Sequence, residues 1–219
     1  MSQDRQLQEN ILAELSWEPS VVSAHIGVAA KDGIVTLTGH VGSFAEKHAA
    51  AAAARRVRGV HGVAEEIEVR LPFDHRRDDA DIAAAAVDRL AWDVSVPRDA
   101  IAVTVENGWL ALSGQVERHY QREAAEQDVR RLHGVVGVSN QITIRPSIDT
   151  GSLSDEIAHA LHRSWFFDPK TVSVTASHGE VRLSGTVHSL SERNEAAAAA
   201  WAAPGTASVV NNIAIADHR

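Results

Sequence analysis

One pattern of residues occurs three times along this chain, and it constrains the fold more than any other feature. Residues 15–71, 90–146 and 161–217 align without a gap. The first copy contributes Leu15, Val28, Gly33, Leu37, Gly39, Val41, Gly59 and Ile67, and the same residue types recur 75 and then a further 71 positions along the chain. An internal repeat sets the number of structural units before any fold is assigned. A catalytic constellation usually occurs once, so a core that is copied three times indicates binding or assembly.

Composition narrows the class of protein. The 219 residues divide into three units of about 70 residues, and small domains are individually marginal because they bury a small share of their surface. We therefore expect the units to pack on one another. The net charge of −8 is spread evenly and offers no basic footprint, which argues against nucleic acid as a partner. There is no cysteine, which excludes disulfides and thiolate metal sites.

The first residues of the sequence indicate the cellular compartment in which the protein is expected. Residues 1–8 lack the basic start and apolar stretch of a secretory signal, and no run of about 18–20 apolar residues could span a bilayer. These features predict a cytoplasmic protein, or a periplasmic one if a signal sequence was removed.

Each unit is predicted to begin with a helix and a hairpin. Leu7, Ile11 and Leu15 are spaced i, i+4, i+8, which places one apolar stripe on a helix face, and the other two units repeat this spacing. Alternating strands follow, joined by Asp32-Gly33, Asn107-Gly108 and His178-Gly179, of which the first two are typical of tight hairpin turns. The glycine in the return strand, Gly39 in the first unit, predicts a bulge or a close backbone approach.

A second helix and a last strand complete each unit. The helices are predicted at residues 44–58, 119–133 and 190–203, and the strands at 63–69, 138–144 and 209–215. Ser43-x-x-Glu46 and Ser189-x-x-Glu192 resemble capping boxes. Gly59, Gly134 and Gly205 are predicted to end the second helices as C-caps.

The order of elements predicts an α+β fold. Each unit would be a two-layer sandwich, helix-strand-strand-helix-strand, in which two helices cover a three-stranded mixed sheet. The hairpin is antiparallel, and the crossover helix allows the last strand to join in parallel. We predict three such domains at residues 1–72, 77–146 and 150–217.

The repeated motif resembles the BON domain. The first copy reads Gly33-Ile34-Val35-Thr36-Leu37-Thr38-Gly39-His40-Val41 and then Gly59-Val60-His61-Gly62-Val63, the second copy keeps both stretches, and the third keeps Gly179 through Val187 but ends Gly205-Thr206-Ala207-Ser208-Val209. The resemblance implies a non-catalytic module. Members of the family are mostly associated with the cell envelope, binding to phospholipid surfaces is the role usually proposed, and some are linked to osmotic stress or, in a cytosolic relative, to potassium sensing.

Aromatic residues are the candidate binding residues. Trp17, Trp92 and Trp165 follow the first helix of each unit, and Trp165 continues as Phe166-Phe167. Aromatic rings suit a membrane interface, so these five residues are candidate lipid- or partner-binding residues. The alternative is that each tryptophan packs where helix meets sheet, or seals the joint between units. Trp109 and Trp201 do not recur, and we expect each to fill a local gap or an interface between units.

Nothing in the sequence predicts catalysis or a metal. His159 and His162 are spaced i, i+3 but lack a carboxylate partner, and His119-Tyr120 has no supporting motif. Asp32, Glu65 and Glu66 are interpreted as a solvated acidic edge. We expect no enzyme activity, no metal site and no cofactor.

The preferred function is a non-catalytic interaction protein linked to osmotic or envelope stress, which binds a phospholipid surface or a protein partner through apolar and aromatic contacts. One alternative is a soluble sensor of potassium or of a small ligand. The other is a structural homo-oligomer.

Overall fold

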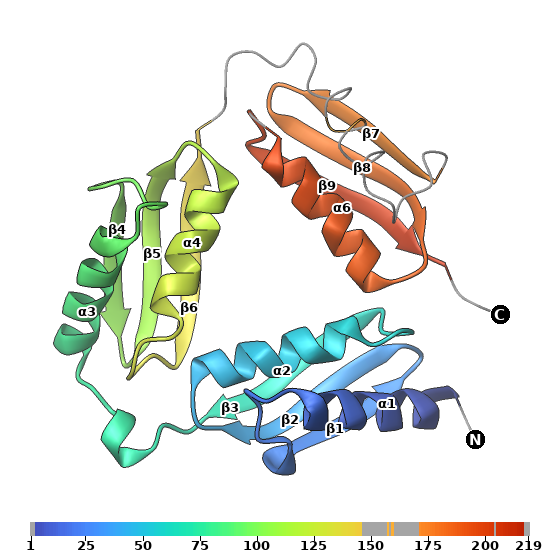
Figure 1. The fold of residues 1–219 in the computed structure, drawn as a ribbon, viewed down its shortest axis with the longest axis horizontal. Helices are drawn as coiled ribbons and strands as arrows, with labels where there is room; N and C mark the ends of the chain where they lie inside the picture. Colours follow the sequence, from blue (N-terminus) through green and yellow to red (C-terminus); the bar gives the residue numbers. More distant parts are fainter. Residues whose placement is uncertain (1–2, 146–156, 158, 160–170, 204, 217–219) are drawn as a thin grey trace. The chain divides into compact units, whose positions relative to one another are not determined.

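The computed structural model describes residues 3–145, 157, 159, 171–203 and 205–216. Three sheets of three strands each are present, with helices against them (Figure 1). The first repeat contains α1 (Gln3–Trp17), β1 (Ile26–Lys31), β2 (Ile34–Val41), α2 (Phe44–Arg56) and β3 (Gly62–Val69). The second contains α3 (Asp79–Trp92), β4 (Ile101–Glu106), β5 (Trp109–Val116), α4 (His119–Val129) and β6 (Gly137–Ile144). The third contains β7 (Val172–Ser177), β8 (Glu180–Val187), α6 (Leu190–Ala202) and β9 (Ser208–Ile215).

The sheets are mixed, as the order of elements predicts. The second strand of each repeat lies in the centre of its sheet. β1 pairs antiparallel with β2, and β2 pairs in parallel with β3, so that Leu37 lies opposite Val28 on one side and beside Glu65 on the other. The third repeat has the same register, with Leu183 between Val174 and Asn211. The predicted α+β fold with three repeated units is confirmed.

The helices cover one face of the first sheet. α1 packs on β1, α2 packs on β3, and the two helices also contact each other (Figure 1). Leu7, Ile11 and Leu15 are buried, as their helical spacing predicts. Alanines on α2 are fully buried and let this helix lie close to the sheet. Each fully buried aliphatic side chain contributes about 1.5–3 kcal/mol, so this apolar layer supplies the main stabilisation of the unit.

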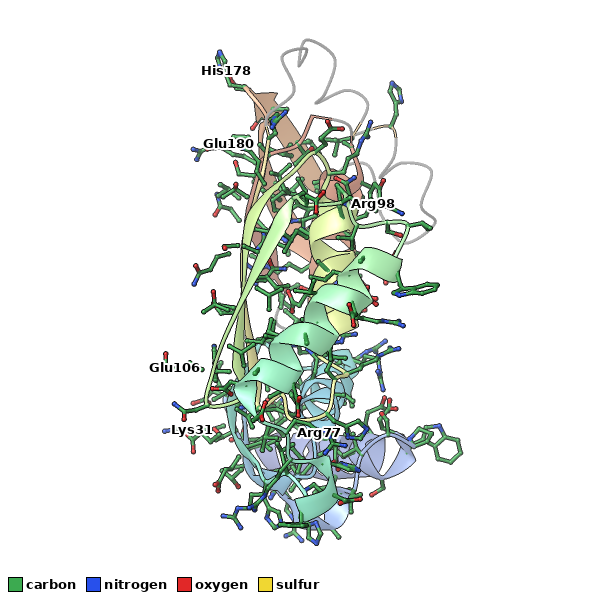
Figure 2. The ribbon with its side chains drawn as sticks, turned by 90° about the vertical axis from the view of Figure 1, so that its left-hand side faces the viewer. Lys31, Arg77, Arg98, Glu106, His178 and Glu180 are labelled. Atoms are coloured by element: carbon green, nitrogen blue, oxygen red, sulfur yellow. The ribbon has the colours of Figure 1, made fainter. Side chains whose placement is uncertain are left out.

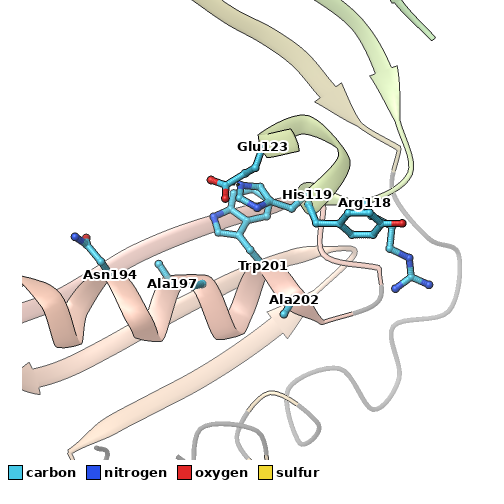
Figure 3. A pocket seen from close by; sticks show the side chains of 9 residues that line it. Arg118, His119, Glu123, Asn194, Ala197, Trp201 and Ala202 are labelled. Carbon is cyan, nitrogen blue, oxygen red and sulfur yellow. Dashed lines mark ion pairs between the residues drawn. The ribbon is translucent and has the colours of Figure 1, made fainter. Parts of the chain in front are cut away.

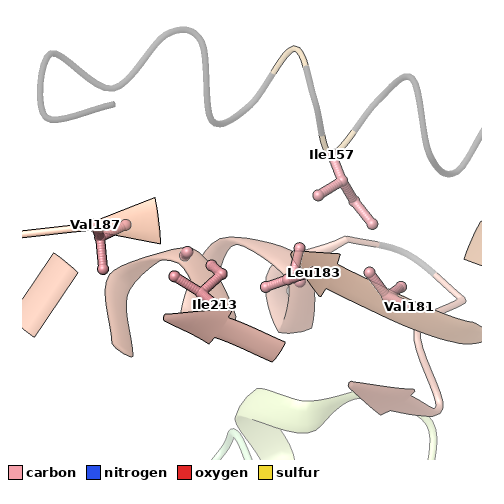
Figure 4. Close-up of a cluster of buried hydrophobic side chains, with 7 residues drawn as sticks. Ile157, Val181, Leu183, Val187 and Ile213 are labelled. Carbon is pink, nitrogen blue, oxygen red and sulfur yellow. The ribbon is translucent and has the colours of Figure 1, made fainter. Parts of the chain in front are cut away.

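The third repeat has an equivalent core. Ile157 packs with strand residues and with two alanines of α6 in one cluster (Figure 4). The cluster consists of Ile157, Val181, Leu183, Val187, Ala196, Ala200 and Ile213. Ile157 belongs to the predicted apolar stripe of a first helix, whose other members, Leu153 and Leu161, lie outside the described residues.

The hairpin turns have the predicted backbone. Asp32, Asn107 and His178 all have positive φ angles of 50° to 52°, and each is followed by a glycine with positive φ. Two such residues in sequence form the tight turn that matches the twist of the flanking strands. The neighbouring side chains of Lys31 and Glu106, and that of His178, point into solvent (Figure 2).

The glycine of the return strand marks a close approach, as predicted. At Gly39 φ is +107°, and a Cβ atom there would lie 2.0 Å from the carbonyl oxygen of His25. The equivalent Cβ atoms at Gly114 and Gly185 would lie 2.1 Å and 1.9 Å from a carbonyl oxygen. Only glycine fits at this point of each sheet.

The predicted C-caps are wrong. α2 ends at Arg56, and its C-cap Val57 leaves the helix with extended backbone angles, before Gly59 is reached. Gly59 and Gly134 instead adopt φ near +90° where the chain passes beneath the first helix, against Leu7 and Ile82 respectively. Gly205 likewise follows the C-cap residue of α6, Ala203, rather than capping the helix. Each of the three glycines therefore permits a turn with positive φ after the helix, and Gly59 and Gly134 also permit close packing against the first helix.

The predicted capping boxes are confirmed. The backbone N–H of Glu46 donates to Ser43 Oγ at 3.1 Å, and the N–H of Glu192 donates to Ser189 Oγ at the same distance. The Glu46 and Glu192 carboxylates accept in return from the N–H groups of Gly42 and His188, so each box closes near its N-cap.

Contacts between Cα atoms divide the chain into two compact units, residues 1–87, 104–110 and 128–139 in one and residues 88–103, 111–127 and 140–219 in the other. This division does not follow the repeats, and the domain limits predicted from the sequence stay a prediction. No described helix is both long and apolar enough to cross a membrane.

Candidate functional site

Two of the predicted binding residues are almost entirely exposed. Trp17 is the last residue of α1 and Trp92 is the last residue of α3, and their exposed fractions are 85% and 84%. Each follows its last core leucine, Leu15 or Leu90, by two residues. Two residues correspond to about 200° around a helix, so the indole lies opposite the buried stripe. Neither tryptophan packs in the core of its own repeat.

The other three candidates, Trp165, Phe166 and Phe167, lie outside the described residues. Trp17 and Trp92 are related by the repeat offset of 75, whereas a further 71 residues lead to Arg163 rather than to Trp165. The exposed pair is therefore a feature that the first two repeats share at one aligned position.

Hydrogen bonds hold the loop after Trp17 in place. Arg56, at the end of α2, contacts Glu14 and Glu18 on either side of the tryptophan, each at 3.0 Å. Hydrogen bonds from Ser20 and Arg56 lower the pKa of Glu18, and the same two glutamates raise the pKa of Arg56. Further along the loop, the N–H of Val22 donates to Glu46 Oε1 at 2.8 Å. The indole therefore projects from a backbone that is tied to the second helix.

The loop after Trp92 is held by different contacts. The N–H of Ser95 donates to Asp93 Oδ1 at 2.7 Å, and the N–H of Val96 donates to the Asp93 carbonyl at 3.1 Å. Val96 is buried, which anchors the loop in the core. Val94 is fully exposed two residues after Trp92, and in the first repeat the exposed Val22 lies five residues after Trp17.

The two loops expose apolar side chains and few charged groups that are available to a ligand. The charged groups beside Trp17 are engaged with each other. The loop after Trp17 contains no lysine or arginine, and the loop after Trp92 contains Arg98 together with two aspartates. Among the described residues, no three His, Cys, Asp or Glu side chains come together to hold a metal ion. His159 is exposed, and His162 lies outside the described residues.

The two other tryptophans lie elsewhere. Trp109 is 52% exposed on the face of the second sheet, where its ring covers Gly137, and a Cβ atom on that glycine would lie 2.4 Å from the ring. The sequence predicted that Trp109 fills either a local gap or an interface between units, and the ring occupies the space beside Gly137, which has no side chain. Ile34 covers Gly62 in the same way in the first repeat, with a Cβ distance of 3.2 Å.

Trp201 stacks on His119 with ring centroids 4.2 Å apart, within the unit that contains α4 and α6. The two rings line a pocket of 460 Å³ (Figure 3). Its other lining residues are Arg118, Tyr120, Glu123, Asn194, Ala197, Ala198 and Ala202. Burial lowers the pKa of His119, and Glu123, whose carboxylate lies 4.0 Å away, opposes this. Burial of the ring therefore favours the neutral form of the imidazole. Among the described residues that line the pocket, none is a serine, threonine or cysteine.

Comparison with known proteins supports the repeat. A family model described as BON domain matches residues 3–70, 78–146 and 149–217. The chain is 28% identical to the osmotically-inducible protein Y of Escherichia coli (strain K12) over 144 residues, which are 64% of this chain and 71% of that protein.

Among solved structures, the chain is similar to CdsD, a structural protein of the type III secretion system of Chlamydia trachomatis. The TM-score is 0.28 and the identity 16%, over 98% of this chain and 94% of that chain. A structure of the C-terminal domain of CdsD gives a TM-score of 0.27 at 16% identity, over 99% and 100% of the two chains.

Proposed function

The chain belongs to the BON domain family, and from this premise we propose that it is a non-catalytic interaction protein that binds a phospholipid surface through Trp17 and Trp92. The observation that carries the proposal is the near-complete exposure of both indoles at one aligned position, each at the end of a first helix whose following loop is fixed by hydrogen bonds. Ordered loops lose little conformational entropy on binding, which favours contact by a side chain that is already in place.

The chemistry of the site favours a neutral lipid surface. Indole rings partition to the boundary between hydrocarbon and headgroups, and the exposed Val22 and Val94 extend each apolar contact. The net charge of −8 opposes attraction to anionic lipid, which depends on clusters of lysine and arginine. Binding would therefore depend on apolar area rather than on charge.

The size of the effect follows from the area. A tryptophan side chain buries about 200 Å² when fully covered, and an interface covers about half of it. At about 25 cal/mol per Å², each ring contributes about 2.5 kcal/mol, or about 70-fold in the partition coefficient.

Sedimentation with vesicles tests the proposal. We expect binding to phosphatidylcholine vesicles that changes little between about 50 and 500 mM salt, because apolar contacts are not screened. Trp17→Ala and Trp92→Ala should each weaken binding, and the double variant should abolish it. Tyr120→Ala removes an exposed aromatic ring from a different part of the chain and serves as the matched control. Unchanged sedimentation of the double variant would refute the role of these residues.

A link to osmotic stress is suggested by the similarity to the osmotically-inducible protein Y. A protein named as osmotically inducible shares about a quarter of its residues with this chain over the matched region. We extend this to a link with osmotic or envelope stress, tested by following expression of the protein after a rise in external osmolarity. A level that is unchanged after the rise would remove the link while leaving lipid binding untouched.

A further inference from the structure

The last strand of each repeat lies at the edge of its sheet, so half of its backbone groups point away from the sheet. The N–H of Arg70, directly after β3, donates to the carbonyl of Val41 in β2 at 2.8 Å, which shows which backbone groups of β3 face β2. Because the N–H and C=O of one strand residue point to the same side and alternate along the strand, even-numbered residues face β2. Val63, Glu65, Ile67 and Val69 therefore present their backbone groups outward.

In the third repeat, side chains occupy the central outward groups. Arg193 Nη2 donates to the carbonyl oxygen of Asn211 at 3.0 Å, and Asn211 Oδ1 accepts from the N–H of Ile213 at 3.1 Å. Asn211 Nδ2 in turn donates to the carbonyl of Arg193 in α6 at 2.9 Å. We call this arginine–asparagine arrangement the edge lock. It ties the second helix to the edge strand and satisfies one outward C=O and one outward N–H.

The second repeat has the same edge lock. Arg122 Nη2 donates to the carbonyl of Asn140 at 3.4 Å, and Asn140 Oδ1 accepts from the N–H of Ile142 at 3.2 Å. Asn140 Nδ2 donates to the carbonyl of Arg122 at 3.1 Å and also to Glu126 Oε2 at 3.0 Å. The two locks occupy positions related by the repeat offset of 71 residues. A free strand edge is a template for pairing with another chain, and the locks obstruct two of the three edges that are formed by last strands.

The first repeat lacks the edge lock. Lys47 stands where the other repeats have arginine, and Glu65 stands in place of asparagine. The Glu65 carboxylate turns to Arg55 instead, with which it forms an ion pair. Within the described part of the chain, no side chain bonds the Glu65 carbonyl or the Ile67 N–H. We propose that β3 is an open edge that receives an extended, basic protein segment as a fourth strand.

The charge on β3 selects this occupant. β3 carries Glu65, which pairs with Arg55, Glu68, which pairs with Arg70, and Glu66, whereas β6 and β9 contain no charged residue. A second copy of β3 would place glutamates opposite one another, and like charges in directly opposed positions are destabilising. A segment with lysine or arginine at alternate positions instead places each cation beside Glu66 and Glu68, which share the sheet face turned away from the helices. The remaining residues of the segment lie on the opposite face of the sheet, next to Val63 and Ile67, where threonine or an aliphatic residue fits.

Amide hydrogen exchange of the whole protein tests the proposal residue by residue. The probe is a peptide of eight alternating lysine and threonine residues, the length of β3. At a peptide concentration about ten times Kd, exchange at the outward amides of Val63, Glu65, Ile67 and Val69 should slow about tenfold. Exchange at the even-numbered amides, which already bond to β2, should not change.

A second peptide separates strand pairing from charge attraction. It has the same lysines but carries backbone N-methyl groups on alternate residues along one edge, which removes hydrogen-bond donors and keeps the charge. We expect it to bind at least tenfold more weakly. Equal binding of both peptides, or protection that does not alternate along β3, would overturn the proposal.

Variants that transfer the edge lock provide the matched comparison. Lys47→Arg with Glu65→Asn installs the lock of the other repeats and should reduce peptide binding at least tenfold. Glu65→Gln alone removes the same charge without a lock and should retain most of the binding. If Glu65→Gln loses as much binding as the double variant, charge alone explains it and the open edge is rejected. Slow exchange at the outward amides without peptide, together with a dimer in sedimentation, would identify a second copy as the occupant and also reject the proposal.

Discussion

Replacement of Gly39 by alanine is expected to unfold the first repeat. The added Cβ atom would lie 2.0 Å from the carbonyl oxygen of His25, while ordinary contacts begin near 3.4 Å. The backbone of β2 would therefore have to move away from the segment before β1. The φ angle of +107° is in addition one that residues with a side chain rarely adopt.

The size of the loss follows from these two terms. A residue held in a sparsely populated backbone region costs about 1–3 kcal/mol, and overpacking of a well-packed site costs about 1–3 kcal/mol. The sum of about 2–6 kcal/mol approaches the whole stability of a small domain, which is about 3–5 kcal/mol. We therefore expect Gly39→Ala to remove a cooperative unfolding transition rather than to shift it.

Urea unfolding followed by amide hydrogen exchange measures this effect repeat by repeat. Gly42→Ala is the matched control, since Gly42 lies three residues away, has no positive φ, and a Cβ atom there would meet its nearest neighbour, Glu46 Oε2, at 3.6 Å. The control should change stability by less than about 0.5 kcal/mol. Equal stability of the two variants would show that the close approach at Gly39 does not set the geometry of the sheet.

Three further outcomes are expected. Ser189→Ala removes the N-cap of α6 and should cost about 1 kcal/mol in urea unfolding, with no change if the cap is replaced by water. Thr206→Val removes the buried hydrogen bond to the Ala200 carbonyl and should also cost about 1 kcal/mol, and a neutral result would contradict that bond. Burial lowers the pKa of His119, so NMR titration should find it below the ordinary value of about 6.5, and Trp201→Ala should raise it. Because the pKa of His119 is lower in the folded chain than in the unfolded chain, the unfolded chain binds this proton at a higher pH. The free energy of unfolding should therefore decrease as the pH falls below about 6.5. An unshifted pKa of His119 would refute the burial of the ring.

Local patterns predicted the elements and their order. The i, i+4, i+8 spacing of Leu7, Ile11 and Leu15 placed the first helix and its buried face, and both serine caps formed the expected hydrogen bonds. The strand glycine, Gly39 in the first repeat, was predicted to mark a close approach, and the structure supplies the carbonyl that it approaches. These features depend on residues that are near in sequence or on a backbone shape that one residue type permits.

Other features depended on how elements meet. Gly59 was assigned to a helix C-cap because glycine after a helix is typical of one, yet its role is to let the chain pass beneath Leu7 of α1, more than 50 residues earlier. The exposure of Trp17 and Trp92 could have been predicted, since a residue two positions beyond the core stripe turns to the opposite face.

The sequence alone determined three similar α+β units, their mixed sheets, their turns and the glycines that recur in each repeat, because periodicity and backbone preference are encoded locally. Only the tertiary structure decided which of the three last strands lacks the edge lock. The edge lock joins Arg193 to Asn211 across 18 residues, and its bonds exist only because α6 packs on β9. At the aligned positions of the first repeat stand Lys47 and Glu65, and in the described part of the chain no side chain bonds the Glu65 carbonyl or the Ile67 N–H. The edge lock forms only where a packed helix brings an arginine to the backbone of the edge strand. A local sequence pattern does not contain this contact between distant residues.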